Sequence, residues 1–322
     1  MSSQMDKLAL HLLNGTQEAA LACYPWVGRG DSDGADGAAV AAMRAAFDAL
    51  PAKATVVIGE GEKDEAPMLY LGEVVGSGDG PEIELAVDPL ENTSACARGI
   101  EGAVAVVAAT PAGTMWETPG WYMNKVVVGP AAAGVIDIER PPEDNVRRVA
   151  EALDKPLEET MVVVLDKPRH EDLVKRLHEL GASVRLIPEG DILGALEAVF
   201  PDGPADLLLG IGGTPEGVIT ACAVRILGGD MQAALAPQKE GEEERLAEAG
   251  QKPGQPITLE ELIGSDDCCF VATGVTTGAL LQGPERTAWG WRTNSLVVTR
   301  LHPGLLIDSP YTTASTEEGA DA

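Results

Sequence analysis

We predict an α/β protein made of two α/β subdomains, and three features of the sequence support this prediction. Short apolar runs rich in Val, Ile, Leu and Ala recur along the chain and are typical of buried strands. From about residue 160 to 227 such runs alternate with helical segments, which indicates a mainly parallel sheet. The 322 residues suffice for one large domain or two ordinary ones, and the pattern changes near residues 140–160. We therefore expect subdomains over residues 1–150 and 151–311 and a disordered acidic tail over 312–322.

The first half of the chain is expected to begin with two helices. Apolar residues at helical spacing lie in the first 25 residues, namely Leu8, Leu12, Ala19 and Ala22. A Gly-rich loop follows, and an Ala-rich helix then begins near Asp36 and ends before Pro51. Apolar runs predict strands at Thr55–Ile58, Ile83–Val87, Gly102–Ala109 and Lys125–Val128. A further helix is expected at Asn145–Leu153.

The second half alternates between strands and helices. The predicted strands are Met161–Leu165, Val184–Ile187 and Leu207–Ile211, and the helices that follow them are His170–Leu180, Ile192–Phe200 and Pro215–Leu227. Residues 237–256 are charged and rich in Gly and Pro, so we expect a surface excursion there. Two late strands, Cys268–Thr273 and Ser295–Thr299, are expected to complete a sheet.

Composition excludes several classes of protein. The 23 basic and 51 acidic residues give a net charge of −28, which argues against nucleic-acid or anionic-membrane partners. No apolar run approaches the roughly 20 residues of a membrane helix, and the start of the chain lacks the cationic flank of a secretory signal. The five scattered cysteines imply neither a disulfide framework nor a zinc site. We expect a cytoplasmic protein.

Acidic residues follow two of the predicted strands. Glu60 and Glu62 come after the strand at 55–58, and Asp88 and Glu91 come after the strand at 83–87. Ligands in α/β folds collect beyond strand ends, and carboxylates packed there repel one another. Hard divalent cations such as Mg²⁺ or Mn²⁺ relieve that repulsion and attract phosphate. With 51 acidic residues in the chain, the alternative that these are solvated loop residues stays open on spacing alone.

Basic and glycine-rich segments follow strands in the second half. Lys167 and Arg169 could clasp a phosphate, or they could simply neighbour the next helix. The Gly-rich turn at 210–217, with Pro215 at the expected start of a helix, could cradle an anion on backbone N–H groups. It is neither a Walker A loop nor a dinucleotide-binding fingerprint, and no Ser lies in a GxSxG elbow. His170 is the one histidine that we expect near a site.

Taken together, these motifs resemble the class II fructose-1,6-bisphosphatase family of bacteria, within the superfamily of lithium-sensitive, metal-dependent sugar phosphatases. The matching stretches keep their order from about residue 5 to 300 and are 26–31 (WVGRGD), 35–37 (ADG), 57–62 (VIGEGE), 64–70 (DEAPMLY), 86–91 (AVDPLE), 167–170 (KPRH), 190–191 (GD) and 210–217 (GIGGTPEG). The resemblance implies alternating helix and sheet layers with a site between two subdomains. It also implies removal of the 1-phosphate of fructose 1,6-bisphosphate, with sedoheptulose 1,7-bisphosphate as a further candidate substrate. Two or more Mn²⁺ or Mg²⁺ ions and a homo-oligomer, dimer or tetramer, are implied as well.

The resemblance also assigns roles to positions of this chain. The implied metal ligands are Asp36, Glu60, Asp88, Glu91 and Glu216. The implied substrate contacts are Glu91, Asn92, Thr93, Tyr122, Lys167, Pro168, Arg169, Glu189, Gly190, Asp191 and Gly213. Thr93 is the candidate for orienting the attacking water, with Glu60 and Asp88 as the other catalytic residues. Asp36, Tyr122, Asp191 and Glu216 rest on the resemblance alone.

Three positions depart from the family pattern. Asn92 stands where the family has Gly, and Asn replaces Gly best where the φ angle is positive. Glu189 stands where Asp is usual, and Ser32 stands where Lys is common. These departures leave two alternatives open: a related sugar, inositol or nucleotide monophosphatase, or a drifted, non-catalytic metabolite-binding protein.

Overall fold

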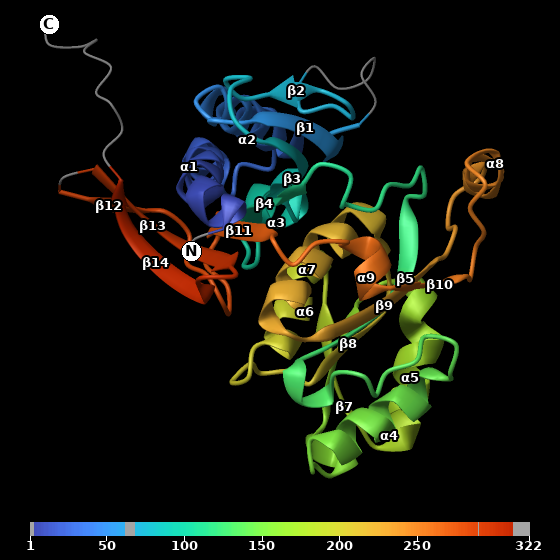
Figure 1. Ribbon diagram of the computed structural model, residues 1–322. Coiled ribbons are helices and arrows are strands. Elements are labelled where there is room, and N and C mark those ends of the chain that lie inside the picture. Colours follow the sequence, from blue (N-terminus) through green and yellow to red (C-terminus); the bar gives the residue numbers. More distant parts are fainter. Residues whose placement is uncertain (1–2, 62–67, 289, 312–322) are drawn as a thin grey trace, which may run out of the picture.

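The computed structural model describes residues 3–61, 68–288 and 290–311, and it contains two mixed β-sheets with helices between and around them (Figure 1). The first sheet has the strand order β12 (Glu285–Thr287), β13 (Gly290–Thr299), β11 (Cys269–Gly274), β4 (Val104–Pro111), β3 (Glu82–Glu91), β1 (Lys53–Ile58) and β2 (Val74–Val75), with β14 (Pro303–Tyr311) paired to β13. The second has the order β10 (Pro256–Thr258), β9 (Asp230–Leu235), β5 (Tyr122–Val128), β8 (Leu207–Gly213), β6 (Met161–Leu165) and β7 (Ser183–Ile187). The predicted α/β fold is confirmed.

Helices form three layers around the two sheets (Figure 1). The helices α1 (Gln4–Cys23) and α2 (Ser32–Phe47) pack on the outer face of the first sheet. Between the sheets lie α6 (Asp191–Val199) and α7 (Thr214–Leu227), and α7 contacts strands of both. The outer face of the second sheet carries α4 (Pro142–Ala152) and α5 (Glu171–Leu180). The shorter helices are α3 (Thr93–Arg98), α8 (Glu242–Glu248), α9 (Leu259–Leu262), η1 (Tyr24–Trp26), η2 (Pro130–Ala132), η3 (Leu157–Glu159) and η4 (Pro168–His170).

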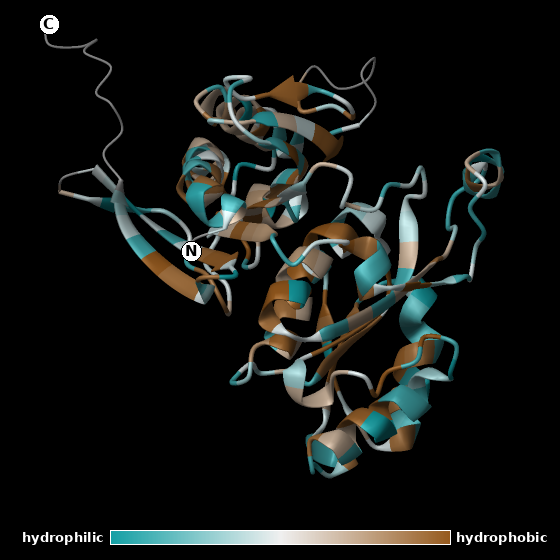
Figure 2. Cartoon of the chain, viewed as in Figure 1, coloured by the Kyte–Doolittle hydropathy of each residue, from teal (hydrophilic) through white to brown (hydrophobic). Residues whose placement is uncertain are grey.

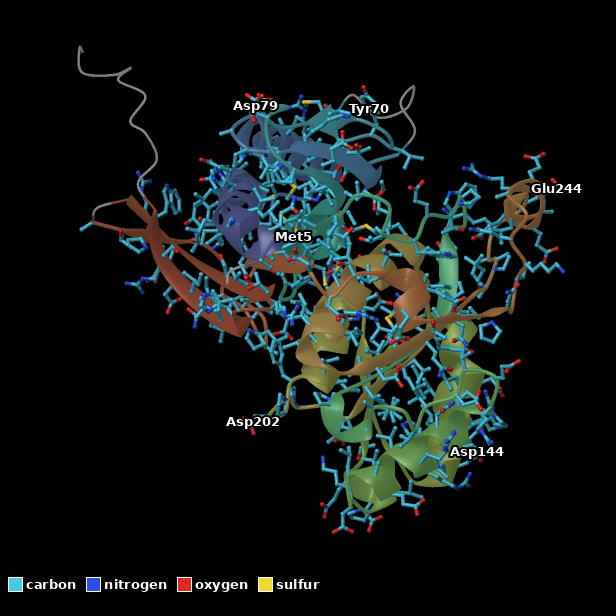
Figure 3. All side chains as sticks on the ribbon, viewed as in Figure 1. Met5, Tyr70, Asp79, Asp144, Asp202 and Glu244 are labelled. Atoms are coloured by element: carbon cyan, nitrogen blue, oxygen red, sulfur yellow. The ribbon has the colours of Figure 1, made fainter. Side chains whose placement is uncertain are left out.

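The central strands are apolar on both faces because helices cover both faces. In β4, Val104 and Val106 pack into the core shared with α6 and α7, whereas Ala105 and Val107 pack into the core shared with α1 and α2. Side chains of a strand alternate between its faces, so a strand buried on both sides must be a continuous apolar run. The inner strands and helices are accordingly brown in Figure 2. Figure 3 shows the complementary pattern, with Asp144, Asp202 and Glu244 at the outer edges and Met5 inside.

The structure corrects several sequence-based boundaries. The second long helix, α2, begins at Ser32 because Asp31 caps it by accepting a hydrogen bond from the Gly34 N–H, so Asp36 lies inside the helix. The strand β3 continues past Asp88 to Glu91, with an irregular register between these residues. Pro89 lies within this irregular stretch, and the strand continues beyond it.

The expectation of a mainly parallel sheet is only partly right. The strands β6, β7 and β8 pair in parallel, but β5 runs antiparallel to both β8 and β9. The strands β2, β9, β10, β12 and β14 were not predicted. Most of them are short or edge strands with weak apolar patterns, and partner strands remote in sequence decide their pairing.

Strands from both ends of the chain build the first sheet. It contains β1–β4 and β11–β14, whereas β5–β10 form the second sheet, so the sheets divide the chain differently from the expected subdomains 1–150 and 151–311. The expected acidic tail at 312–322 lies outside the described residues. All five cysteines are buried and free. Among the described helices, none has both the length and the apolar character needed to cross a membrane.

Candidate active site

A cavity of about 830 Å³ receives side chains from both sheets. Its walls come from α2, from the segments after β1, β3 and β6, from the start of β5, and from the N-terminal ends of α3, α6 and α7. The predicted site residues that line it are Asp36, Glu60, Asp88, Glu91, Asn92, Thr93, Tyr122, Lys167, Arg169, Glu189, Gly190, Gly213 and Glu216. Segments more than a hundred residues apart in the sequence therefore meet at one place.

Two predicted substrate residues do not line the cavity. Pro168 lies in η4 between two residues that do. The Asp191 carboxylate is 4% exposed and forms an ion pair of 2.5 Å with the Lys125 ammonium, which is 2% exposed. The Lys125 ammonium also donates to the Gly213 carbonyl at 3.0 Å. Asp191 thus lies beneath the glycine-rich end of β8. Glu62, a further acidic residue singled out in the sequence, lies outside the described residues.

Five carboxylates, Asp36, Glu60, Asp88, Glu91 and Glu216, form what we call the acidic wall of the cavity. Burial, with the charge of Asp36 added, raises the pKa of Glu60 to about 7. Burial and the neighbouring carboxylates raise the pKa of Asp88 and Glu91 well above their ordinary values. The pKa values of Asp36 and Glu216 are raised as well, first by burial. Positive charge bound in the cavity would therefore favour the ionised form of all five groups.

The donor set of the acidic wall suits hard divalent cations. Glu91 Oε1 accepts a hydrogen bond from the Ile192 N–H at 3.3 Å, but Glu91 Oε2 and Glu216 Oε2 are buried without a hydrogen-bond donor. Buried carboxylate oxygens without donors are costly, and Mg²⁺ and Mn²⁺ prefer such oxygens as ligands. Within the described ranges, no three His, Cys, Asp or Glu side chains are already arranged around a common metal position. The residue types fit a metal site, and the carboxylates would have to turn toward a bound ion.

The loop after β3 confirms the expectation for Asn92. This residue has φ 62° and ψ 52°, the left-handed conformation in which Asn replaces Gly at low cost. Its side-chain oxygen accepts from the Ala95 N–H at 3.3 Å, and its amide donates to the Glu189 carbonyl at 3.4 Å. The Ser94 hydroxyl donates to the Glu189 carboxylate. The loop that starts α3 is thereby joined to the loop that starts α6.

Lys167 and Arg169 form what we call the basic end of the cavity. The Lys167 ammonium lies 3.3 Å from Glu189 Oε1. The Arg169 guanidinium donates from Nε and Nη2 to the Ile211 carbonyl at 2.9 and 2.8 Å. Its Cζ atom lies 5.5 Å from the centroid of the Tyr122 ring. These contacts hold both cations in the segment that follows β6, which lines the same cavity as the acidic wall.

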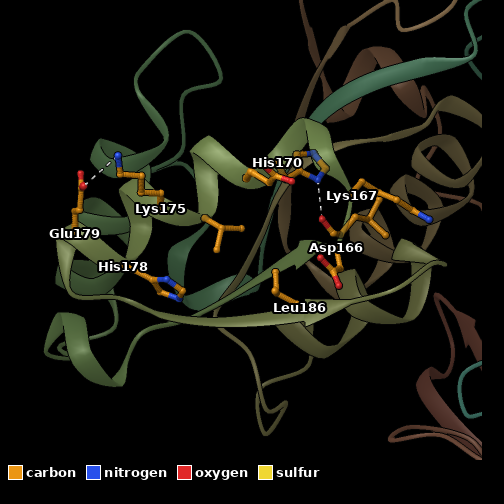
Figure 4. A pocket seen from close by; sticks show the side chains of 10 residues that line it. Asp166, Lys167, His170, Lys175, His178, Glu179 and Leu186 are labelled. Atoms are coloured by element: carbon orange, nitrogen blue, oxygen red, sulfur yellow. Dashed lines mark hydrogen bonds and ion pairs between the residues drawn. The ribbon is translucent and has the colours of Figure 1, made fainter.

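His170 supports the basic end without lining the cavity. Its Nε2 accepts from the Ile211 N–H at 2.8 Å, which assigns the proton to Nδ1, and Nδ1 donates to the Leu165 carbonyl at 2.8 Å (Figure 4). The carbonyl of the same residue, Ile211, accepts the hydrogen bonds from the Arg169 guanidinium. His170 lies in a neighbouring pocket of about 520 Å³ (Figure 4), which shares Leu165 and Lys167 with the cavity. His170 is therefore a buried support.

Sequence reasoning missed four side chains of this region that can form polar or cation–π contacts. Trp121, Ser94 and Lys239 line the cavity, and Lys125 lies beneath it. Local sequence carries little signal for them. The segment around Lys239 has the composition of a surface loop, and Lys125 begins an apolar run in which a buried cation was not expected.

Comparisons with known proteins agree on one family. A family profile described as bacterial fructose-1,6-bisphosphatase, glpX-encoded, matches residues 6–304. The fructose-1,6-bisphosphatase class 2 of Haemophilus influenzae is 47% identical over 292 residues, which cover 87% of this chain and 88% of that protein. The fructose-1,6-bisphosphatase 2 class 2 of Escherichia coli K12 is 44% identical over 307 residues, which cover 91% of this chain and 96% of that protein. With the fold and the cavity described above, these matches show that the chain belongs to the bacterial, glpX-type fructose-1,6-bisphosphatase family.

Proposed function

We propose that this protein hydrolyses the 1-phosphate of fructose 1,6-bisphosphate, giving fructose 6-phosphate and inorganic phosphate. The family supports the reaction, because its class 2 members are named for it. The observation that carries the proposal is the cavity itself, whose lining includes the five carboxylates of the acidic wall and the basic side chains of Lys167 and Arg169. A molecule with phosphates at both ends suits such a site, since one phosphate would share cations with the acidic wall and the other would meet the basic end.

The acidic wall would hold two or more divalent cations, and we propose Mg²⁺ or Mn²⁺. The buried, unpartnered oxygens of Glu91 and Glu216 support this assignment. When bound, such ions supply positive charge to the reacting phosphate and make a nearby water more acidic. The ligands that we propose are Asp36, Glu60, Asp88, Glu91 and Glu216.

The protein's own groups would orient the reactants. The Thr93 hydroxyl donates a hydrogen bond to the Leu90 carbonyl at 2.9 Å. Its oxygen could therefore accept a hydrogen bond from the attacking water. The N-terminal ends of α6 and α7 lie at the cavity, and their N–H groups favour the negative charge of a phosphate. Lys167, Arg169 and Tyr122 would hold the distal phosphate and so align the reacting one.

Glu189, one of the three departures from the family pattern, bears on the range of substrates. Glu189 already pairs with Lys167, so a distal phosphate must compete with this carboxylate for the Lys167 ammonium. Sedoheptulose 1,7-bisphosphate presents the same two groups on a longer sugar, and we propose it as a second substrate. A monophosphate would leave the basic end without a phosphate, which makes a monophosphatase the weaker candidate.

The direct test is phosphate release from fructose 1,6-bisphosphate with Mg²⁺, with Mn²⁺ and with EDTA. We expect release with at least one ion and none with EDTA. Fructose 1-phosphate and inositol 1-phosphate, tested in parallel, measure how much the second phosphate contributes. Folded protein that releases no phosphate from fructose 1,6-bisphosphate with either ion would refute the proposal.

A further inference from the structure

The cavity holds a third basic side chain to which none of the roles above applies. Lys239 lies between β9 and α8 and lines the same cavity as Lys167 and Arg169. Its ammonium lies 4.9 Å from the centroid of the Trp121 ring and 5.6 Å from that of the Tyr122 ring. Arg169 lies 5.5 Å from the same Tyr122 ring, so the two cations share an aromatic neighbour. Lys239 thus belongs spatially to the basic end.

Lys239 differs from Lys167 in its partners. Lys167 pairs with the Glu189 carboxylate, which neutralises part of its charge within the protein. Across the described residues, the Lys239 ammonium forms no ion pair with a carboxylate and lies instead over the two aromatic rings. A cation over aromatic rings keeps its charge and its hydrogen-bond donors. A phosphate at the basic end would therefore bind Lys239 without displacing a carboxylate.

A buried carboxylate holds the segment that carries Lys239. Glu242 is 0% exposed, and its Oε1 accepts from the N–H groups of Trp121 and Tyr122 at 2.7 and 2.9 Å. Its Oε2 accepts from the N–H groups of Gln238 and Lys239 at 2.9 and 3.4 Å. Burying a carboxylate is costly unless donors satisfy it, and here four backbone donors do so. Glu242 thus fixes the Lys239 backbone against the start of β5.

We infer that Lys239 binds the distal phosphate of a bisphosphate substrate and that Glu242 is the residue that positions Lys239. The inference rests on the proposed function, because it requires a substrate with a second phosphate. It gives the 237–256 segment a role in substrate binding as well as its place on the surface. The chemistry is that of an ammonium donating to a phosphate oxygen, and no covalent step is involved.

The test compares a bisphosphate with a monophosphate. Lys239→Met should lower kcat/KM for fructose 1,6-bisphosphate by about tenfold, mainly through KM, the loss expected for one hydrogen bond to a charged group. Fructose 1-phosphate lacks the distal phosphate, so its kcat/KM should not change. Lys239→Arg should retain most of the activity because it keeps the charge. Lys252→Met, the same change at an exposed lysine of the same segment, should leave both substrates unaffected.

The role of Glu242 is tested through Lys239. Glu242→Gln should reproduce the loss on the bisphosphate, and the double variant Glu242→Gln/Lys239→Met should lose no more than Lys239→Met alone. Equal losses on both substrates in Lys239→Met would overturn the inference, as would an unchanged kcat/KM for the bisphosphate. If the wild-type protein hydrolyses no bisphosphate, the proposed function fails separately. Calorimetric titration of fructose 1,6-bisphosphate into wild type and Lys239→Met then decides the inference, and equal affinities would overturn it.

Discussion

The buried ion pair beneath the cavity offers a sharp test of how the site is held together. Lys125 and Asp191 are 2% and 4% exposed, and their charged atoms are 2.5 Å apart, so no solvent screens either charge. Removing one member of such a pair leaves an uncompensated buried charge, which typically costs about 3–5 kcal/mol. We expect Lys125→Met to lower the free energy of unfolding by about that amount.

Two further variants separate charge from packing. Asp191→Asn removes the charge and keeps the shape of the side chain. The shape matters because Asp191 packs closely against Gly212: a Cβ added to Gly212 would lie 2.0 Å from Asp191 Oδ2. The double variant Lys125→Met/Asp191→Asn removes both charges and should therefore recover at least about 1 kcal/mol relative to Lys125→Met. Lys53→Met is the matched control, because Lys53 pairs with Glu82 at 2.8 Å and both side chains are exposed, at 49% and 66%. Its loss should stay within about 1 kcal/mol.

The assay is urea denaturation followed by circular dichroism, with all four variants and the wild type at pH 7. Free energies of unfolding are compared by linear extrapolation, and a change in slope would show a change in the denatured or native state. A loss for Lys125→Met no larger than that of Lys53→Met would refute the reasoning. So would a double variant less stable than Lys125→Met, because the uncompensated charge would then not be the cause.

Three further predictions concern the site and its supports. Glu60→Gln should abolish metal-dependent phosphate release while the circular dichroism spectrum and urea midpoint stay close to wild type; substantial remaining activity would remove Glu60 from the proposed ligands. Asn92→Gly should change the free energy of unfolding by only a few tenths of a kcal/mol. Asn92→Ala should lower it by about 2–3 kcal/mol, because Ala provides no helix cap and disfavours the left-handed conformation. Equal effects of the two variants in urea denaturation would contradict this. Burial lowers the pKa of His170 below its ordinary 6.5, so its neutral form stabilises the folded state above that pH and the contribution is lost as pH falls. The free energy of unfolding should therefore fall more steeply between pH 7.5 and 5 in the wild type than in His170→Gln, and parallel pH profiles would argue against this role.

We expect the protein to form a homo-oligomer. Sedimentation equilibrium of the purified protein measures its mass directly. A dimer or tetramer is the expected result, and a monomer at micromolar concentration would contradict it.

Local sequence indicated most of the elements and, of the candidate ligands, Glu60, Asp88 and Glu91. The apolar run at Met161–Leu165 forms a strand with the predicted bounds, because a short, continuous run rich in Val is typical of a strand that is buried on both faces. Glu60, Asp88, Lys167 and Arg169 were singled out because each follows the end of a predicted strand, and all four line the cavity. The conformation of Asn92 was likewise predictable, because few residues other than Gly tolerate a positive φ angle.

Only the tertiary structure decided which charges are buried and what holds the basic residues in place. Lys125 lies in an apolar strand, and nothing near it in the sequence indicates that its partner is Asp191, more than sixty residues away. Glu242 and Lys239 look like members of a charged loop until the fold brings their segment against Trp121 and Tyr122. His170 has its effect through the backbone of Ile211. Such roles depend on contacts between remote segments, which composition and spacing do not encode, because packing between layers fixes them.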